Sequence, residues 1–166
     1  MFRPILLIFV LIHLYQHSWT QSVGSPLFGA MLNTLIHNKE MAIDVDEAAQ
    51  MSHALFFFFF DSTEYAVSHL PGAVRIGYTD YNPGIMNKIP LDMPIVVYCS
   101  VGRRSEDICE KLRKSGFNNA QNMYGGIFEW INRSLPVHDM SDRVVTRVHT
   151  YNKSWGVWVN CPDKIH

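Results

Sequence analysis

The chain has 166 residues, which is the length of one domain with short extensions and excludes a repeat array or a multidomain enzyme. Hydrophobic residues make up 48% of the chain and charged residues 17%, so the chain can bury a core and is not disordered. With 14 basic and 15 acidic residues, the net charge of -1 argues against a nucleic-acid-binding protein that works by neutralising phosphates.

The N-terminal segment has the pattern of a secretory signal. Arg3 is followed by the apolar run 5–12 and then by the polar stretch 17–22, which predicts a signal peptide over residues 1–20 with cleavage after Thr20. The apolar run is too short to cross about 30 Å of hydrocarbon comfortably. An uncleaved N-terminal anchor is therefore the second interpretation and a buried helix the third. We expect an exported protein, periplasmic or extracellular, with no membrane span in the mature chain.

Residues 21–39 are predicted to form a helical lead-in. After a boundary at residues 24–26, apolar residues recur at helical spacing, namely Phe28, Met31, Leu32, Leu35 and Ile36. Residues 41–43 then indicate a short strand, and the acidic residues 46–47 fit the first turn of a brief helix. We interpret the lead-in helix as a packing element.

Two continuous apolar runs predict strands that are buried on both faces. Residues 55–60 include five consecutive phenylalanines, and residues 95–98 have the sequence Ile-Val-Val-Tyr. Between the runs, residues 61–64 indicate a helix start, residues 69–73 a turn, and residues 77–94 a long surface connection. Such strands separated by helical stretches imply a parallel sheet with helices on both faces, so the predicted fold class is α/β.

The C-terminal part of the chain predicts two more elements and a tail. Residues 119–123 favour a further strand and residues 127–132 a last helix. The tail, residues 144–159, is rich in aromatic side chains and could add a strand or cover a sheet edge. We expect its tryptophans, Trp155 and Trp158, to pack over that edge rather than to bind a ligand.

Cys99 follows the second apolar run, and a helix is predicted over residues 105–115. The loop between them lies at the carboxyl end of a parallel strand, where ligands bind in open α/β sheets. The loop amides, the helix N-terminus and nearby guanidinium groups all favour the thiolate form of a cysteine at this place. We therefore interpret Cys99 as a nucleophile rather than a buried structural thiol.

This loop resembles the active-site loop of the rhodanese-like sulfurtransferases; its residues are Cys99, Ser100, Val101, Gly102, Arg103, Arg104 and Ser105. Further segments resemble the same family in the same order; they are residues 64–65, 69–73, 116–117 and 124–130. The resemblance implies the rhodanese-like three-layer fold, with a small, mostly parallel sheet and helices on both faces. It assigns residues 40–135 to that domain and leaves residues 136–166 as a C-terminal extension packed on it.

The resemblance also implies a function and a site. Cys99 would be the catalytic residue, which takes a sulfane sulfur from thiosulfate or a persulfide and passes it to a thiol or cyanide. The substrate-binding residues would be Ser100, Val101, Gly102, Arg103, Arg104 and Ser105. Backbone N–H groups of the loop would surround the outer sulfur, and Arg103 would attract an anionic donor. Neither a cofactor nor a metal is implied, and the three cysteines are scattered rather than clustered.

Two other functions compete with sulfur transfer. Phosphatases of the same broad structural class usually have one more residue between the cysteine and the arginine, to hold a three-oxygen group. Only residues 100–103 separate Cys99 from Arg104, so the shorter loop favours sulfur. The second alternative is a catalytically weak or inactive binding module, because the family commonly has an aspartate and an arginine where Phe58 and Phe60 stand here.

Three remaining residues have simpler interpretations. Cys109 lies on the apolar face of the predicted helix 105–115 and is expected to pack in the core. Cys161 is expected to be an unpaired surface thiol, with a resolving partner for Cys99 as the alternative. His69 precedes a proline-glycine turn and is expected to form structural hydrogen bonds rather than to act as a base.

Overall fold

The computed structural model describes residues 22–58, 61–77 and 83–166. Its centre is a sheet of five parallel strands in the order β1-β5-β4-β2-β3. The strands are β1 (Ala42–Ile43), β2 (Leu55–Phe58), β3 (Val74–Arg75), β4 (Ile95–Tyr98) and β5 (Ala120–Met123). The helices along this part of the chain are α1 (Pro26–Leu35), α2 (Val45–Gln50), α3 (Ser62–Val67), α4 (Arg103–Lys114) and α5 (Gly126–Asn132). The predicted signal peptide lies outside the described residues.

Strand β4 is the middle of the sheet and divides the core into two halves. All four of its residues are fully buried, which is why this segment of the sequence is apolar throughout. Ile95 and Val97 pack with the apolar face of α4, whereas Val96 and Tyr98 pack with α1, α2 and α5. Successive side chains of a strand point to opposite faces, so this division confirms the predicted sheet with helices on both faces.

Helix α1 forms as the spacing of its apolar residues predicts. Ser25 caps its N-terminus by accepting a hydrogen bond from the N–H of Phe28 at 3.3 Å, and Pro26 occupies the first turn. Phe28 and Leu32 are buried against the half of the core that contains α5. The helix is therefore a packing element of the domain, as predicted.

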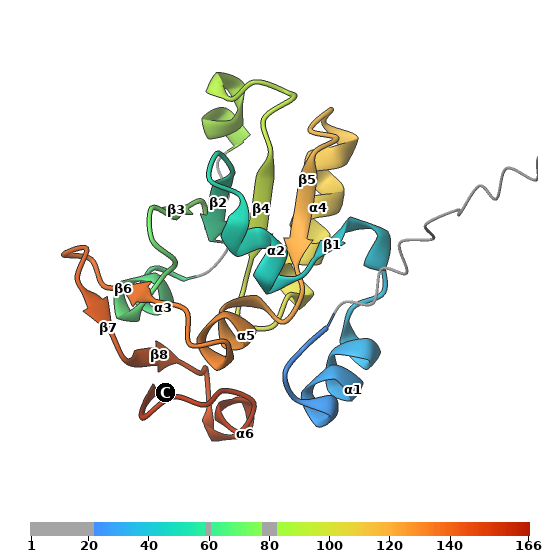
Figure 1. Cartoon of the computed structure of the whole chain (residues 1–166). Coiled ribbons are helices and arrows are strands. Elements are labelled where there is room, and N and C mark those ends of the chain that lie inside the picture. The colour runs from blue at the N-terminus through green and yellow to red at the C-terminus, as the bar shows by residue number, and fades with distance from the viewer. Residues whose placement is uncertain (1–21, 59–60, 78–82) are drawn as a thin grey trace, which may run out of the picture.

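The C-terminal segment, residues 136–166, forms elements of its own. These are β6 (Val137–His138), β7 (Val144–Val145), β8 (Arg147–His149), α6 (Lys153–Gly156) and β9 (Asp163–Ile165). β6 pairs with β7 and β8 pairs with β9, so these strands form two small sheets instead of extending the central one. In Figure 1 the segment (orange to red) lies at the end of the sheet toward which the β5 arrow points.

Two element predictions need correction. Helix α4 begins at Arg103, two residues before the predicted start, because the left-handed backbone of Gly102 ends the loop there. The stretch 77–94 is not only a surface connection, since it contains the 3₁₀ helix η2 (Pro83–Lys88), which buries Met86 in the core. Among the residues that the structure describes, no helix has the length and apolar character needed to span a membrane.

Candidate active site

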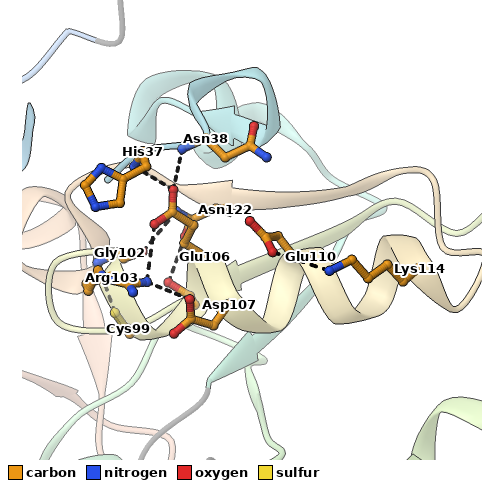
Figure 2. Close-up of polar contacts among 11 residues, drawn as sticks. His37, Asn38, Cys99, Gly102, Arg103, Glu106, Asp107, Glu110, Lys114 and Asn122 are labelled. Atoms are coloured by element: carbon orange, nitrogen blue, oxygen red, sulfur yellow. Dashed lines mark hydrogen bonds and ion pairs between the residues drawn. The ribbon is translucent and has the colours of Figure 1, made fainter. Parts of the chain in front are cut away.

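Cys99 lies directly after β4, and its side chain is held inside the loop that leads to α4. Only 2% of the residue is exposed. Its Sγ accepts a hydrogen bond of 3.0 Å from the N–H of Gly102, which is drawn in Figure 2. Gly102 has φ +99°, and a Cβ there would lie 2.9 Å from Ile36 and 3.1 Å from the carbonyl of Met123. The turn that brings this N–H to the sulfur therefore requires glycine.

The N-terminus of α5 holds the outer side of the same loop. The N–H of Ile127 donates to the carbonyl of Cys99 at 2.8 Å, and that of Phe128 donates to the carbonyl of Ser100 at 3.0 Å. A Cβ on Gly126 would fall 2.0 Å from the Cys99 oxygen, so only glycine allows this approach. In a planar trans peptide the N–H points away from the carbonyl. The N–H groups of Ser100 and Val101 therefore face away from α5.

A buried hydrogen-bonded pair, Ser105 and Asn122, supports the loop from the core side. The hydroxyl of Ser105 donates to Oδ1 of Asn122 at 2.7 Å, and Nδ2 of Asn122 donates to the carbonyl of Gly102 at 3.0 Å. Both side chains are fully buried. In this geometry the Ser105 hydroxyl is turned into the core and does not line the cavity, and its role in substrate binding stays a prediction. Asn122 has the same bracing role, which no motif of the sequence indicated.

Arg103 is held by acidic residues of its own helix. Its guanidinium donates to Asp107 at 2.7 Å and to Glu106 at 3.4 Å (Figure 2). Glu106 is itself 97% buried, and its other oxygen accepts from the backbone N–H groups of His37 and Asn38 at 2.7 and 2.5 Å, which compensates for the loss of water. This carboxylate links the active-site helix to the segment that follows α1.

Arg104 pairs with a buried carboxyl group from α3. Its Nη2 lies 3.5 Å from Oε1 of Glu64, and Nδ1 of His149 in β8 lies 3.7 Å from the same oxygen. Burial raises the pKa of Glu64 to about 7, an effect that the charge of Arg104 opposes. Burial also lowers the pKa of His149. The C-terminal segment thus contributes a titratable group to the neighbourhood of the loop.

A cavity of about 330 Å³ gives access to Cys99. Its lining residues are Leu35, Cys99, Ser100, Val101, Arg103, Arg104, Tyr151 and Trp155. Five of the seven predicted site residues therefore line one cavity. The other two, Gly102 and Ser105, do not line it and support the loop through their hydrogen bonds. Leu35 of α1 and the aromatic pair of the tail were not predicted. Trp155 is a correction, because it lines the cavity rather than only covering an edge.

A match with a known family decides how this geometry is classified. The model of the rhodanese-like domain matches residues 30–133, which include the sheet, α4, α5 and the whole loop after Cys99. The chain belongs to the rhodanese-like domain family. The predicted α/β, three-layer fold of that family is therefore confirmed, and the aromatic part of the cavity comes from outside the matched residues.

Individual relatives support the same family at modest identity. A sulfurtransferase of Allochromatium vinosum is 38% identical over 74 residues, which are 45% of this chain and 68% of that protein. The probable adenylyltransferase/sulfurtransferase MoeZ of Mycobacterium tuberculosis is 34% identical over 77 residues, which are 46% of this chain and only 20% of that protein. The polysulfide-sulfur transferase homodimer of Wolinella succinogenes has a similar fold, with a TM-score of 0.54, 19% identity, and coverage of 69% of this chain and 89% of that one.

The rhodanese-like domain departs from the family pattern near Glu64. Phe58 ends β2, whereas Phe60 lies outside the described residues. The side chains that the structure describes near the Glu64 carboxyl group are the Arg104 guanidinium from α4 and the His149 imidazole from the tail. Neither of these contacts was predicted, because the residues are far apart in the sequence and no local pattern links them.

The other two cysteines of the chain, one in the rhodanese-like domain and one in the C-terminal segment, do not line the cavity of Cys99. Cys109 is fully buried in α4, its thiol bonds to the carbonyl of Ala120 at 3.2 Å, and burial raises its pKa to about 12, which confirms a packing role. Cys161 is only 8% exposed and bonds to the carbonyl of Thr146 at 3.1 Å, so the prediction of a surface thiol is wrong. Burial raises the pKa of Cys161 as well. It lines a separate cavity, and all three cysteines are free.

His69 forms structural contacts, as predicted. Its backbone exchanges two hydrogen bonds with His138, of 2.9 and 2.8 Å, and its ring stacks on Tyr65 at a centroid distance of 3.9 Å. The residue does not line the cavity of Cys99. Within the described parts of the chain, no group of three or more His, Cys, Asp or Glu side chains is arranged to hold a metal ion.

Proposed function

We propose that this rhodanese-like domain transfers a sulfane sulfur from a donor, thiosulfate or a persulfide, to a thiol or cyanide acceptor through a persulfide on Cys99. The observation that carries the proposal is the position of Cys99 Sγ, which lines the cavity and accepts the Gly102 N–H at 3.0 Å. A hydrogen bond to sulfur at a helix N-terminus stabilises the thiolate, which is the nucleophilic form.

In the first step the Cys99 thiolate attacks the outer sulfur of thiosulfate. The new sulfur–sulfur bond forms while the bond to the central sulfur breaks, and sulfite leaves with that electron pair. Charge balances, because a thiolate and a dianion give a persulfide anion and a sulfite dianion. The N–H groups of Ser100 and Val101, which face away from α5, are suited to stabilise the negative outer sulfur.

In the second step an acceptor thiolate attacks the outer sulfur of the persulfide. The bond between that sulfur and Cys99 breaks, its electron pair returns to the Cys99 sulfur, and the acceptor leaves as a persulfide. The cycle needs no oxidant, reductant or cofactor. Arg104 lines the cavity and pairs with the buried Glu64, so its guanidinium has a defined position beside the reacting sulfur.

The experiment that tests this proposal is intact-mass analysis after treatment with thiosulfate, beside a thiosulfate-to-cyanide transfer assay. We expect a gain of about 32 mass units on Cys99. Cys99→Ser should lose the adduct and at least about a thousandfold of the activity. Cys109→Ser is the control and should keep both. Absence of the adduct, or equal rates in Cys99→Ser and the unmodified protein, would leave only a binding module of rhodanese fold.

We also propose that the protein is exported to the periplasm or the extracellular space. The support is the short basic start, the apolar run 5–12 and the polar stretch that follows it. The same mass spectrum tests this, since protein recovered from the producing cells should lack residues 1–20. Recovery of the full chain from the cytosolic fraction would contradict export and would leave the proposed chemistry untouched.

A further inference from the structure

Part of the cavity wall belongs to neither the loop nor the matched family region. Tyr151 and Trp155 come from the C-terminal segment, and Leu35 comes from the end of α1. These three side chains line the same cavity as Cys99. The two aromatic residues lie beyond residues 30–133, which the family model matches. These three side chains are called the apolar wall; Leu35 lies within the matched residues, and the aromatic part of the wall comes from outside them.

Local hydrogen bonds hold the two aromatic residues in place. Oδ1 of Asn152 accepts from the N–H of Trp155 at 3.1 Å and so caps α6. The N–H of Tyr151 donates to Nδ1 of His149 at 3.2 Å. Thr150, which lies between His149 and Tyr151 in the sequence, is fully buried, and its N–H donates a 2.8 Å hydrogen bond to the carbonyl of Ile165 in β9. Tyr151 is nevertheless 65% exposed and has φ +64°, which is uncommon for a bulky residue.

The size and lining of the cavity fit an organic molecule as the sulfur acceptor. A volume of about 330 Å³ falls within the range of about 300–1,000 Å³ that is typical of pockets for organic ligands. Both arginines of the lining are also paired with carboxylates, Arg103 with Asp107 at 2.7 Å and Arg104 with Glu64 at 3.5 Å. The positive charge of the two arginines is thereby partly compensated. The apolar wall provides a surface on which an apolar group of a ligand can pack.

We propose that Leu35, Tyr151 and Trp155 select the sulfur acceptor, and that this acceptor is a small organic thiol with an apolar, preferably aromatic, body. The inference rests on the proposed sulfur transfer at Cys99. An aromatic ring of the acceptor packs on the wall and places its thiolate beside the persulfide. The thiolate then attacks the outer sulfur, the bond to Cys99 breaks, and the electron pair returns to the Cys99 sulfur.

The test compares benzyl mercaptan with 2-mercaptoethanol as acceptors that discharge the preformed Cys99 persulfide. We expect kcat/KM to be at least about tenfold higher for benzyl mercaptan, because an apolar pocket discriminates an added apolar group by this order. Trp155→Ala should remove most of that preference, because the ratio of the two kcat/KM values depends on the aromatic surface, and Trp155→Phe should keep it. Val157→Ala is the control, since Val157 lies on the same segment, is 71% exposed and does not line the cavity. Equal preference in Trp155→Ala and the unmodified protein overturns the inference.

A second measurement separates this inference from the proposed function. Benzyl methyl sulfide has an apolar ring but cannot accept sulfur, and its binding to the Cys99→Ser variant can be followed by saturation-transfer NMR. We expect binding that Trp155→Ala weakens at least about fivefold and Val157→Ala leaves unchanged. If no persulfide forms but this binding is found, the sulfur transfer fails and the apolar selectivity of the cavity stands. If the thioether does not bind, or binds equally well without Trp155, the selectivity fails whatever the chemistry.

Discussion

The active-site loop and the C-terminal segment contribute to the same cavity in different ways. The loop, residues 99–105, lies between β4 and α4, and hydrogen bonds within it, to β5 and to the N-terminus of α5 hold its backbone. The C-terminal segment, residues 136–166, has small sheets of its own and reaches the cavity through Tyr151 and Trp155. The loop holds the proposed nucleophile, and the tail shapes the space that a substrate enters.

The difference shows how one family fold can carry a chain-specific site. The loop tolerates little variation at two glycines. Gly102 in the loop and Gly126 of α5, which packs against the loop, both have a positive φ and leave no room for a Cβ. In the tail the cavity surface is made by the side chains of Tyr151 and Trp155. We expect substitutions in the loop to affect folding and chemistry together, and substitutions in the tail to affect acceptor choice.

Gly126→Ala should have the largest effect and tests the rigidity of the loop. The new Cβ would lie 2.0 Å from the carbonyl oxygen of Cys99 and 2.7 Å from the carbonyl group of Ser100, at φ +56°. Because the clash is with backbone, α5 and the loop must separate. We expect the free energy of unfolding to fall by about 3 kcal/mol or more and the Cys99 adduct to be lost. Urea denaturation and intact mass measure the two effects.

The matched substitution in the tail is Gly156→Ala. This glycine lies in helix α6, and its Cβ would meet side-chain atoms of Lys164 and Thr150 at 3.4 Å and of His166 at 3.7 Å. We expect a change in unfolding free energy of less than about 1 kcal/mol, because alanine is favourable in a helix and the contacts are near van der Waals distance. If both variants were equally stable, the contrast between a rigid loop and a tolerant tail would be lost.

Glu64→Gln should have the next largest effect and sharpens the comparison where the two regions meet. Burial raises the pKa of Glu64 to about 7 in the folded protein, against about 4.5 in the unfolded chain. Between these values the folded state holds more protons than the unfolded state, so the contribution of Glu64 to stability falls as the pH rises. Denaturation of both proteins from pH 4.5 to 7 should show their difference in unfolding free energy change by up to about 3 kcal/mol.

The control for this prediction is Glu47→Gln, whose carboxyl group lies on the exposed side of α2. A difference between Glu64→Gln and the unmodified protein that stays constant with pH would mean that Arg104 and His149 together compensate the buried carboxyl group fully. A changing difference would assign the shift to burial.

The sequence predicted the elements whose signals are local. The apolar run of β4 and the one-sided apolar pattern of α4 were enough to place Cys99 at the carboxyl end of a buried strand. The predicted start of α4 was two residues too late, because the left-handed conformation of Gly102 cannot be inferred from periodicity. The packing role of Cys109 followed from its position on the apolar face of that helix.

Contacts between distant segments could not be predicted from the sequence. Glu64 and His149 are 85 positions apart, and neither periodicity nor turn chemistry connects them. For the same reason Leu35 and Trp155 were interpreted as packing residues, although both line the cavity. The supporting contact of Ser105 was not predicted, because its place in a loop motif does not reveal the direction of its side chain, which depends on Asn122 in β5.

Ser105→Ala should have a smaller effect than Gly126→Ala and Glu64→Gln, and it decides how the loop is supported. Removing the hydroxyl leaves Oδ1 of the buried Asn122 without its 2.7 Å donor, so we expect a loss of about 1–2 kcal/mol in unfolding free energy. The persulfide should still form, at a lower kcat, because the loop is less well held. If Ser105 instead bound the donor directly, the substitution would raise KM for thiosulfate and leave stability unchanged. Denaturation and steady-state kinetics on one preparation distinguish a positioning residue from a binding residue.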